Sequence, residues 1–285
     1  MTDTQFIKDN LKGSVPKEIS VEVVKNIVSQ STAFNLCKHT PMKSDKKVVP
    51  VLNDTGSAYW VEEGETIGLS IHGWEYPELE AKKLAVIIPV TKEKLEDSVM
   101  GVMSEIKEGI ADAFVRSIDS AIFFGTNSPF DTNIVGSVEV GSQITATDNI
   151  DLDISKAMSK VEESDLVVNG IVAPNSIKGT LRELRDGNGN AIVVPGGVSG
   201  TQIYNTPIYI PTSRAWKAEK ARCIIGDFTK AMIGTRTGIN YEILDQATVG
   251  DINLAERDII AIKCTMRFGF KVVNPKAFSL IKPIG

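Results

Sequence analysis

Apolar side chains recur at helical spacing from about Thr91 to Phe124, and this is the clearest periodicity in the chain. At about 1.5 Å per residue, the segment predicts a helix about 50 Å long, beyond the usual length in a globular domain. Gly125 is expected to end it. The rest of the fold is therefore expected to be built along this helix. The apolar positions are Leu95, Val99, Met103, Ile106, Ile110, Phe114, Ile118 and Ala121.

Acidic residues are distributed along the same predicted helix. They are interpreted as a solvated face rather than as paired catalytic acids, because the charged side chains of an amphipathic helix usually face water. These residues are Glu96, Glu105, Glu108, Asp112 and Asp119.

The segment from Val48 to Val90 predicts a long two-stranded ribbon, with outward strands at 48–52 and 58–61 and a return from about Trp74. Between the two arms lies the acidic stretch 62–68, which has too few apolar residues to form a core. An isolated ribbon of this kind is marginally stable in water. We therefore expect it to lie against a surface outside its own domain. The alternative is that its tryptophans pack within their own subunit.

The remaining chain interleaves helices and strands without a strict βαβ repeat, which predicts the α+β class. Residues 1–20 are polar and predict an arm whose order depends on neighbours, and Ser20 is a candidate N-cap for a short helix that reaches Phe34. Further helices are expected at 151–164 and 174–185. Strands are expected at 166–173, 207–210, 223–227, 231–233, 239–244 and 258–273.

Composition limits the classes of function. The chain has 31 basic and 36 acidic residues and a net charge of -5, which argues against a dedicated nucleic-acid binder. Cys37, Cys223 and Cys264 are odd in number and far apart, which favours a reduced compartment, and the last two stand in apolar runs where buried thiols are expected. We find no signal segment and no run of about 18 apolar residues, so no membrane association is expected.

No constellation of residues for chemistry is recognisable. His39 and His72 are the only histidines, and neither lies in a nucleophile or zinc motif. The stretch 186–190 resembles the start of a calcium loop, but the glutamate expected at the twelfth position is replaced by Gly197. We therefore expect no enzyme activity, no metal and no cofactor.

The order of these parts resembles the major capsid proteins of tailed bacteriophages, with the Hong Kong ninety-seven fold. The likeness covers about residues 20–282, and its strength lies in the order and spacing of motifs that are individually weak. The stretches that carry it are 58–64, 82–98, 172–175, 181–189, 203–208, 226–228, 265–269 and 275–278.

The resemblance implies a division of the chain and a set of contacts. In this family, subunits form hexamers and pentamers, and the extended loop lies across an adjacent subunit. The implied parts are an N-terminal arm at 1–20, an N-terminal helix region at 21–47, an extended loop at 48–90, a peripheral domain at 91–129 and 256–285, and an axial domain at 130–255. The implied inter-subunit contacts on the loop are Tyr59, Trp60, Glu63, Trp74 and Tyr76.

The implied function is a major capsid protein that self-assembles into an icosahedral shell around phage double-stranded DNA. The protein would be part of the virion, assembled in the host cytoplasm, with a portal protein as partner and with DNA held without sequence-specific binding. The alternatives are an encapsulin-like compartment of the same fold and a soluble enzyme that uses the acidic ribbon as a substrate clamp.

Two departures from the family pattern shape these expectations. Some relatives crosslink through a lysine of the extended loop, but the stretch from Gly56 to Glu80 contains no lysine, so no such crosslink is expected. Some relatives also carry a long N-terminal scaffold segment, whereas about 20 residues precede the matched region here. A separate scaffolding protein is therefore expected.

Overall fold

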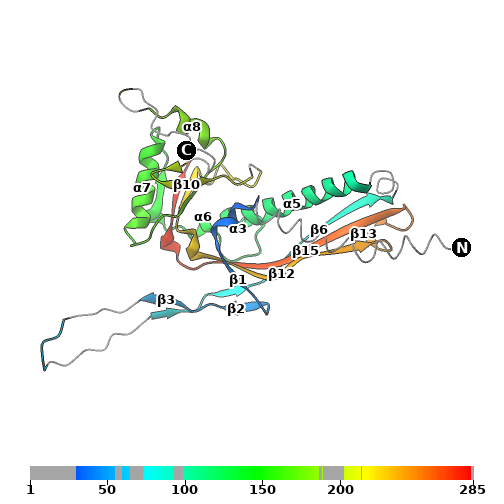
Figure 1. The fold of residues 1–285 in the computed structure, drawn as a ribbon, viewed down its shortest axis with the longest axis horizontal. Coiled ribbons are helices and arrows are strands. Elements are labelled where there is room, and N and C mark those ends of the chain that lie inside the picture. Colours follow the sequence, from blue (N-terminus) through cyan, green and yellow to red (C-terminus); the bar gives the residue numbers. More distant parts are fainter. Residues whose placement is uncertain are drawn as a thin grey trace.

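The computed structural model describes residues 30–54, 60–64, 73–92, 99–185, 188, 202–212 and 214–283. The chain forms two bodies side by side, one containing α5 and the other containing α7 and α8, and a ribbon projects from the place where they meet (Figure 1). The helices are α3 (Thr32–Leu36), α5 (Val99–Phe124), α6 (Ile134–Ser137), α7 (Ile150–Glu162) and α8 (Ile177–Glu183). Short 3-10 turns lie at Val140–Ser142, Phe228–Lys230 and Pro275–Ala277.

One body contains a four-stranded sheet with the order β1-β12-β15-β6. Its strands β12 and β15 are antiparallel and have 14 residues each, and β6 pairs with the other edge of β15. Alternate residues of β6 face the core, so the alternation that the sequence predicts for Leu84, Val86, Ile88 and Val90 is confirmed. The strands are β1 (Lys38–Pro41), β12 (Ala231–Leu244), β15 (Ile259–Val272) and β6 (Lys82–Thr91).

Helix α5 lies along this sheet and supplies much of its core. Ile110, Phe114 and Ile118 from the predicted stripe are fully buried. The helix was expected from about Thr91, but Thr91 itself is still in β6, where it pairs with Ile259. The described part of the helix has 26 residues and is about 39 Å long. Positions 93–98 lie outside the described residues.

A six-stranded sheet with the order β7-β16-β11-β8-β10-β9 forms the second body. Helix α7 packs against it through Ile150, Ile154 and Ala157, which are all fully buried. The predicted helix at 151–164 is thus confirmed within two residues. The strands are β7 (Gln143–Thr145), β16 (Phe278–Lys282), β11 (Cys223–Gly226), β8 (Gly170–Val172), β10 (Thr206–Tyr209) and β9 (Gln202–Ile203), and a separate hairpin joins β13 (Thr248–Val249) to β14 (Ile252–Asn253).

Several predicted elements have different bounds in the structure. The strand expected at 166–173 is limited to β8, since only Gly170–Val172 pairs with β11 and β10. The helix expected at 174–185 is α8, seven residues long. The two strands expected at 231–233 and 239–244 are one strand, β12, because its pairing with β15 continues through two irregularities in register.

Sheet membership crosses the expected division of the chain. Strand β12 falls within 130–255, yet it pairs with β15, which falls within 256–285. Strand β16 falls within 256–285, yet it pairs with β11 and β7 in the second body. Each body is therefore assembled from segments that are distant in sequence.

Near the N-terminus, the expected arm and most of the expected helix from Ser20 lie outside the described residues. Helix α3 begins after Ser31, whose hydroxyl accepts a hydrogen bond from the backbone N–H of Phe34. Cys37, Cys223 and Cys264 are buried and unbridged, which confirms the expectation for the last two. Among the described residues, no helix has the length and apolar character needed to cross a membrane.

Candidate functional site

The ribbon consists of two short strand pairs that leave the four-stranded sheet one after the other (Figure 1). β2 (Lys46–Val48) pairs with β5 (Glu78–Glu80), and β3 (Val51–Asp54) pairs with β4 (Gly73–Glu75). A proline interrupts the expected strand at 48–52, since Pro50 has no N–H to donate. The described turn at 60–64 lies at the far end of the ribbon, away from both bodies.

The base of the ribbon is fixed to the four-stranded sheet by apolar packing and by charge. Leu79 is buried against Met42 and Met232. Asp45 pairs with Arg267 at 2.6 Å and with Arg236, so one carboxylate ties the ribbon to both long strands. These side chains are partly exposed, and ion pairs in such positions contribute about 0–1 kcal/mol each. Leu79 packing is therefore the stronger anchor.

The aromatic residues expected at the inter-subunit contact lie on the surface of the single chain. Trp60 is fully exposed, and Trp74 and Tyr76 are 53% and 65% exposed. Glu63 is also exposed, and Tyr59 lies outside the described residues. Neither Trp60 nor Trp74 is buried in the single chain. Large apolar side chains left in water are typical of a binding surface.

Asp119 corrects the prediction that the acidic residues of the long helix all face water. It is fully buried, and its carboxylate accepts hydrogen bonds from the Ser31 hydroxyl at 2.7 Å and from the backbone N–H groups of Thr32 and Ala33. Burial raises its pKa to about 6, against the lowering effect of these three bonds. No local pattern in the sequence indicates this role, because the donors lie almost 90 residues earlier.

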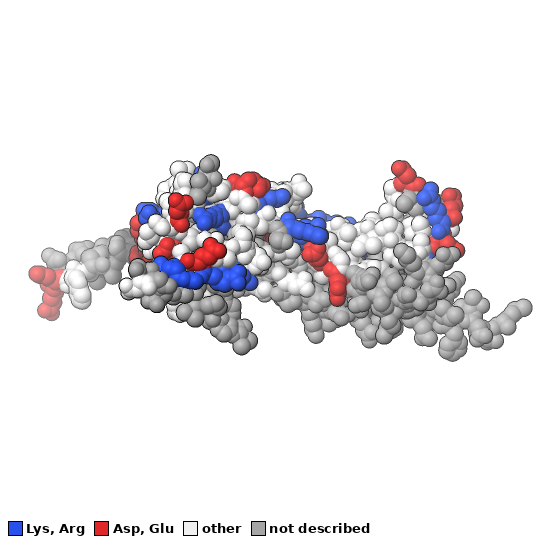
Figure 2. Space-filling model, turned by 90° about the horizontal axis from the view of Figure 1, so that it is seen from above, with Lys and Arg blue, Asp and Glu red and all other residues white. Residues whose placement is uncertain are grey.

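The charge pattern and the titratable groups of the described residues show no arrangement typical of a catalytic site. Basic and acidic side chains are interspersed on the face shown in Figure 2, without a large field of one sign. Among the described residues, no three His, Cys, Asp or Glu side chains are grouped closely enough to hold a metal ion. His39 contacts the carbonyl oxygen of Phe34 through Nε2 and stacks near its ring, which is a structural role.

An elongated α+β subunit with a long helix, a projecting ribbon and exposed aromatic side chains has the form of a structural protein that contacts other chains. The phage capsid family model matches residues 13–282. The chain belongs to this family and is a structural component of the phage particle. The predicted resemblance and the predicted α+β fold class are confirmed.

Individual relatives agree with this assignment. The chain is 26% identical to the major capsid protein of Staphylococcus phage 80alpha, over 99% of this chain and 88% of that protein. It is 20% identical to a probable major capsid protein of Mycobacterium phage D29, over 97% of this chain and 90% of that protein.

Solved structures show the same fold. One from Microbacterium phage Oxtober96 has a TM-score of 0.78 and 26% identity, and covers 89% of this chain and 91% of that chain. A more distant one, the capsid of a native GTA particle, has a TM-score of 0.67 and 14% identity over 96% and 93% of the two chains. These matches favour the phage capsid protein over the encapsulin-like compartment.

Proposed function

We propose that this chain is the major capsid protein of a tailed phage and that its copies form hexamers and pentamers that close into an icosahedral shell around double-stranded DNA. The observation that carries this proposal is the ribbon, whose aromatic side chains are exposed in the single chain. A ribbon of two-stranded pairs has little core of its own. A neighbouring copy supplies the missing surface, through contacts with Trp60, Trp74 and Tyr76, with Glu63 and with Tyr59.

We propose that the two sheets mark the two domains of the subunit. The body with α5 and the sheet of β12, β15 and β6 is the peripheral domain, and the body with α7 and the six-stranded sheet is the axial domain. This assignment moves β6 and 231–255 to the peripheral domain and β16 to the axial domain, relative to the boundaries expected from the resemblance. The N-terminal arm keeps its proposed bounds, and the helix region ends before β2, whose pairing with β5 makes Lys46 and Lys47 part of the ribbon.

Assembly is the mechanism, and we assign no catalytic step to the chain. Each contact between copies is modest, but a closed shell satisfies every interface at once, so the particle is stable although single pairs bind weakly. The proposed partners besides other copies are a separate scaffolding protein, a portal protein and DNA held without sequence-specific binding. We propose that assembly takes place in the host cytoplasm. We also propose that the acidic balance of the chain, with a net charge of -5, gives a shell interior that does not hold phosphates, so that DNA can enter and leave.

Electron microscopy of the expressed chain, with and without the neighbouring genes of its genome, tests the proposal. Uniform icosahedral particles that need the added genes support a phage coat with a separate scaffold. Uniform small shells from this chain alone, filled with a host protein, would instead support the encapsulin-like alternative. A monomer or small oligomer under all conditions, measured by size-exclusion chromatography with light scattering, would contradict both and favour the soluble enzyme.

A further inference from the structure

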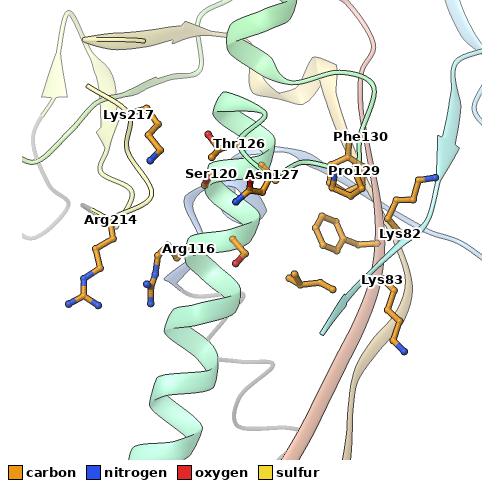
Figure 3. A pocket seen from close by; sticks show the side chains of 14 residues that line it. Lys82, Lys83, Arg116, Ser120, Thr126, Asn127, Pro129, Phe130, Arg214 and Lys217 are labelled. Atoms are coloured by element: carbon orange, nitrogen blue, oxygen red, sulfur yellow. The ribbon is translucent and has the colours of Figure 1, made fainter. Parts of the chain in front are cut away.

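A cavity of about 540 Å³ lies beside the C-terminal half of α5 (Figure 3). Its walls come from four separate segments: the start of β6, helix α5, the loop at 126–130 and the segment at 214–217. Strand β15 adds Phe268. The walls differ in chemical character, and this difference defines what the cavity can bind.

One wall is cationic. Arg116 from α5 lies near Arg214 and Lys217, which come from a segment about 100 residues later in the chain (Figure 3). Arg116 already pairs with Asp112 at 2.8 Å, but its Nε atom is buried and has no hydrogen-bond partner within the described part of the chain. The residues that line the cavity include no aspartate or glutamate. This wall therefore offers donors to an anionic group from outside.

The opposite wall is mainly apolar. The ring of Phe130 packs on that of Phe268, with centroids 5.2 Å apart, and Pro129 lies beside it (Figure 3). Lys82 and Lys83 line this side with their stems, and their ammonium groups point away from the helix in Figure 3. Lys82 pairs with Glu80 at 2.6 Å. An occupant that combines an apolar ring with carboxylates would match both walls.

The exposed turn at the far end of the ribbon has this combination. Trp60 is fully exposed, and Glu62 and Glu63 are exposed two and three residues later. Within one chain the turn lies at the far end of the ribbon, away from α5 (Figure 1). The acidic turn and the cationic wall of the cavity are far apart in one chain, but the turn of one copy can meet the cavity of another copy.

We propose that the turn at 60–64 of a second copy of this chain occupies the cavity. Its carboxylates, Glu62 and Glu63, pair with Arg116, Arg214 and Lys217, and the ring of Trp60 packs on Phe130. This inference rests on the proposed shell function and assigns the receiving site for the ribbon. DNA phosphate is the competing occupant, but a duplex backbone is met by cations spread along an open surface, whereas this cavity is concave and half apolar.

A charge exchange separates the two occupants. The cavity variant carries Arg214→Glu and Lys217→Glu, the turn variant carries Glu62→Lys and Glu63→Lys, and a third chain carries all four changes. Each double variant is expected to lose about tenfold in particle yield by electron microscopy and sedimentation, because like charges then face each other. The chain with all four changes is expected to return to within about twofold of the wild-type yield, since opposite charges face each other again. Lys156→Glu with Lys178→Glu, two exposed cations on α7 and α8, is the matched control and keeps the wild-type yield.

A cysteine pair gives a second readout that does not depend on reversed charge. Glu63→Cys with Lys217→Cys is expected to form disulfide-linked ladders of subunits in oxidised particles, whereas Glu63→Cys with Lys156→Cys forms none. The inference would be overturned if the wild type forms particles, the chain with all four changes recovers no yield, and the cysteine pair forms no ladder. The proposed function would remain supported in that case. Loss of DNA content from otherwise normal particles of the cavity variant would assign the cavity to phosphate. Absence of any wild-type particle would overturn both proposals.

Discussion

The carboxylate of Asp119 accepts a hydrogen bond of 2.7 Å from the hydroxyl of Ser31, 88 residues earlier in the chain. It also accepts from the backbone N–H groups of Thr32 and Ala33 at 3.2 and 3.1 Å. These groups stand in the first turn of α3, where the helix itself provides no acceptor. Asp119 on α5 therefore holds α3 in place and also caps the N-terminus of α3.

Replacing Asp119 by alanine is expected to lower the free energy of unfolding of the isolated subunit by about 2 kcal/mol or more. Three buried donors lose their acceptor, at about 1–3 kcal/mol each, and removal of a buried charge offsets part of this loss. Urea denaturation measures the change. Asp112→Ala on the same helix is the control, because Asp112 is partly exposed and its ion pair with Arg116 contributes about 0–1 kcal/mol. Equal losses in both variants would contradict the anchoring role.

The pH dependence of stability follows from the raised pKa of Asp119. Burial moves the pKa from 3.8 to about 6 in the folded chain. Between these values the folded state binds more protons than the unfolded state, so the contribution of Asp119 to stability is present at low pH and is lost as pH rises through about 6. A shift of about two units corresponds to about 3 kcal/mol. The wild type is therefore expected to lose this amount relative to Asp119→Asn between pH 4 and pH 7, and a constant difference would refute the assignment.

Gly269 lies where the base of the ribbon crosses strand β15. A Cβ atom at this position would stand 2.7 Å from the carbonyl oxygen of Glu80, which is backbone and has little freedom to move. Gly269→Ala is expected to destabilise the subunit by about 1–3 kcal/mol, as overpacking usually does. Gly238→Ala on β12 is the matched control, because a Cβ there meets no atom within 4 Å. Thermal unfolding of both variants provides the comparison, and similar melting temperatures would argue against the contact.

Trp60 is expected to matter for assembly and not for the subunit. Because the side chain is fully exposed, Trp60→Ala should change the free energy of unfolding by less than about 0.5 kcal/mol. Particle yield should fall, since the largest aromatic side chains dominate contact energies. Trp60→Phe keeps a ring and is expected to assemble better than the alanine variant. Normal particles from Trp60→Ala would remove this residue from the proposed interface.

The cysteines are expected to be unreactive in the folded chain. The thiolate is the reactive form, and burial raises the pKa of Cys223 and Cys264 to about 12 and that of Cys37 further still. A chromogenic thiol reagent at pH 8 should label no cysteine before denaturation and three per chain in denaturant. Rapid labelling of the native protein would show that one of these sites opens. The same inertness keeps the background low in the cysteine-pair experiment.

The sequence by itself determined the elements whose pattern is local. The apolar stripe of Ile110, Phe114 and Ile118 predicted helix α5, and the alternation of apolar residues predicted the buried face of strand β6. Both patterns are carried by residues that are close together in the sequence. The ribbon and its exposed aromatic side chains were likewise expected from a segment that lacks a core. The order of these parts also carried the family resemblance.

Only the tertiary structure decided which distant segments meet. It buried Asp119 beneath α3, joined β12 to β15 in one continuous strand pair, and brought Arg116 together with Arg214 and Lys217. It also kept Thr91 in β6, through its pairing with Ile259. Such contacts join chain positions separated by 17 to 168 residues, and neither helical nor strand periodicity contains information about which distant positions pair.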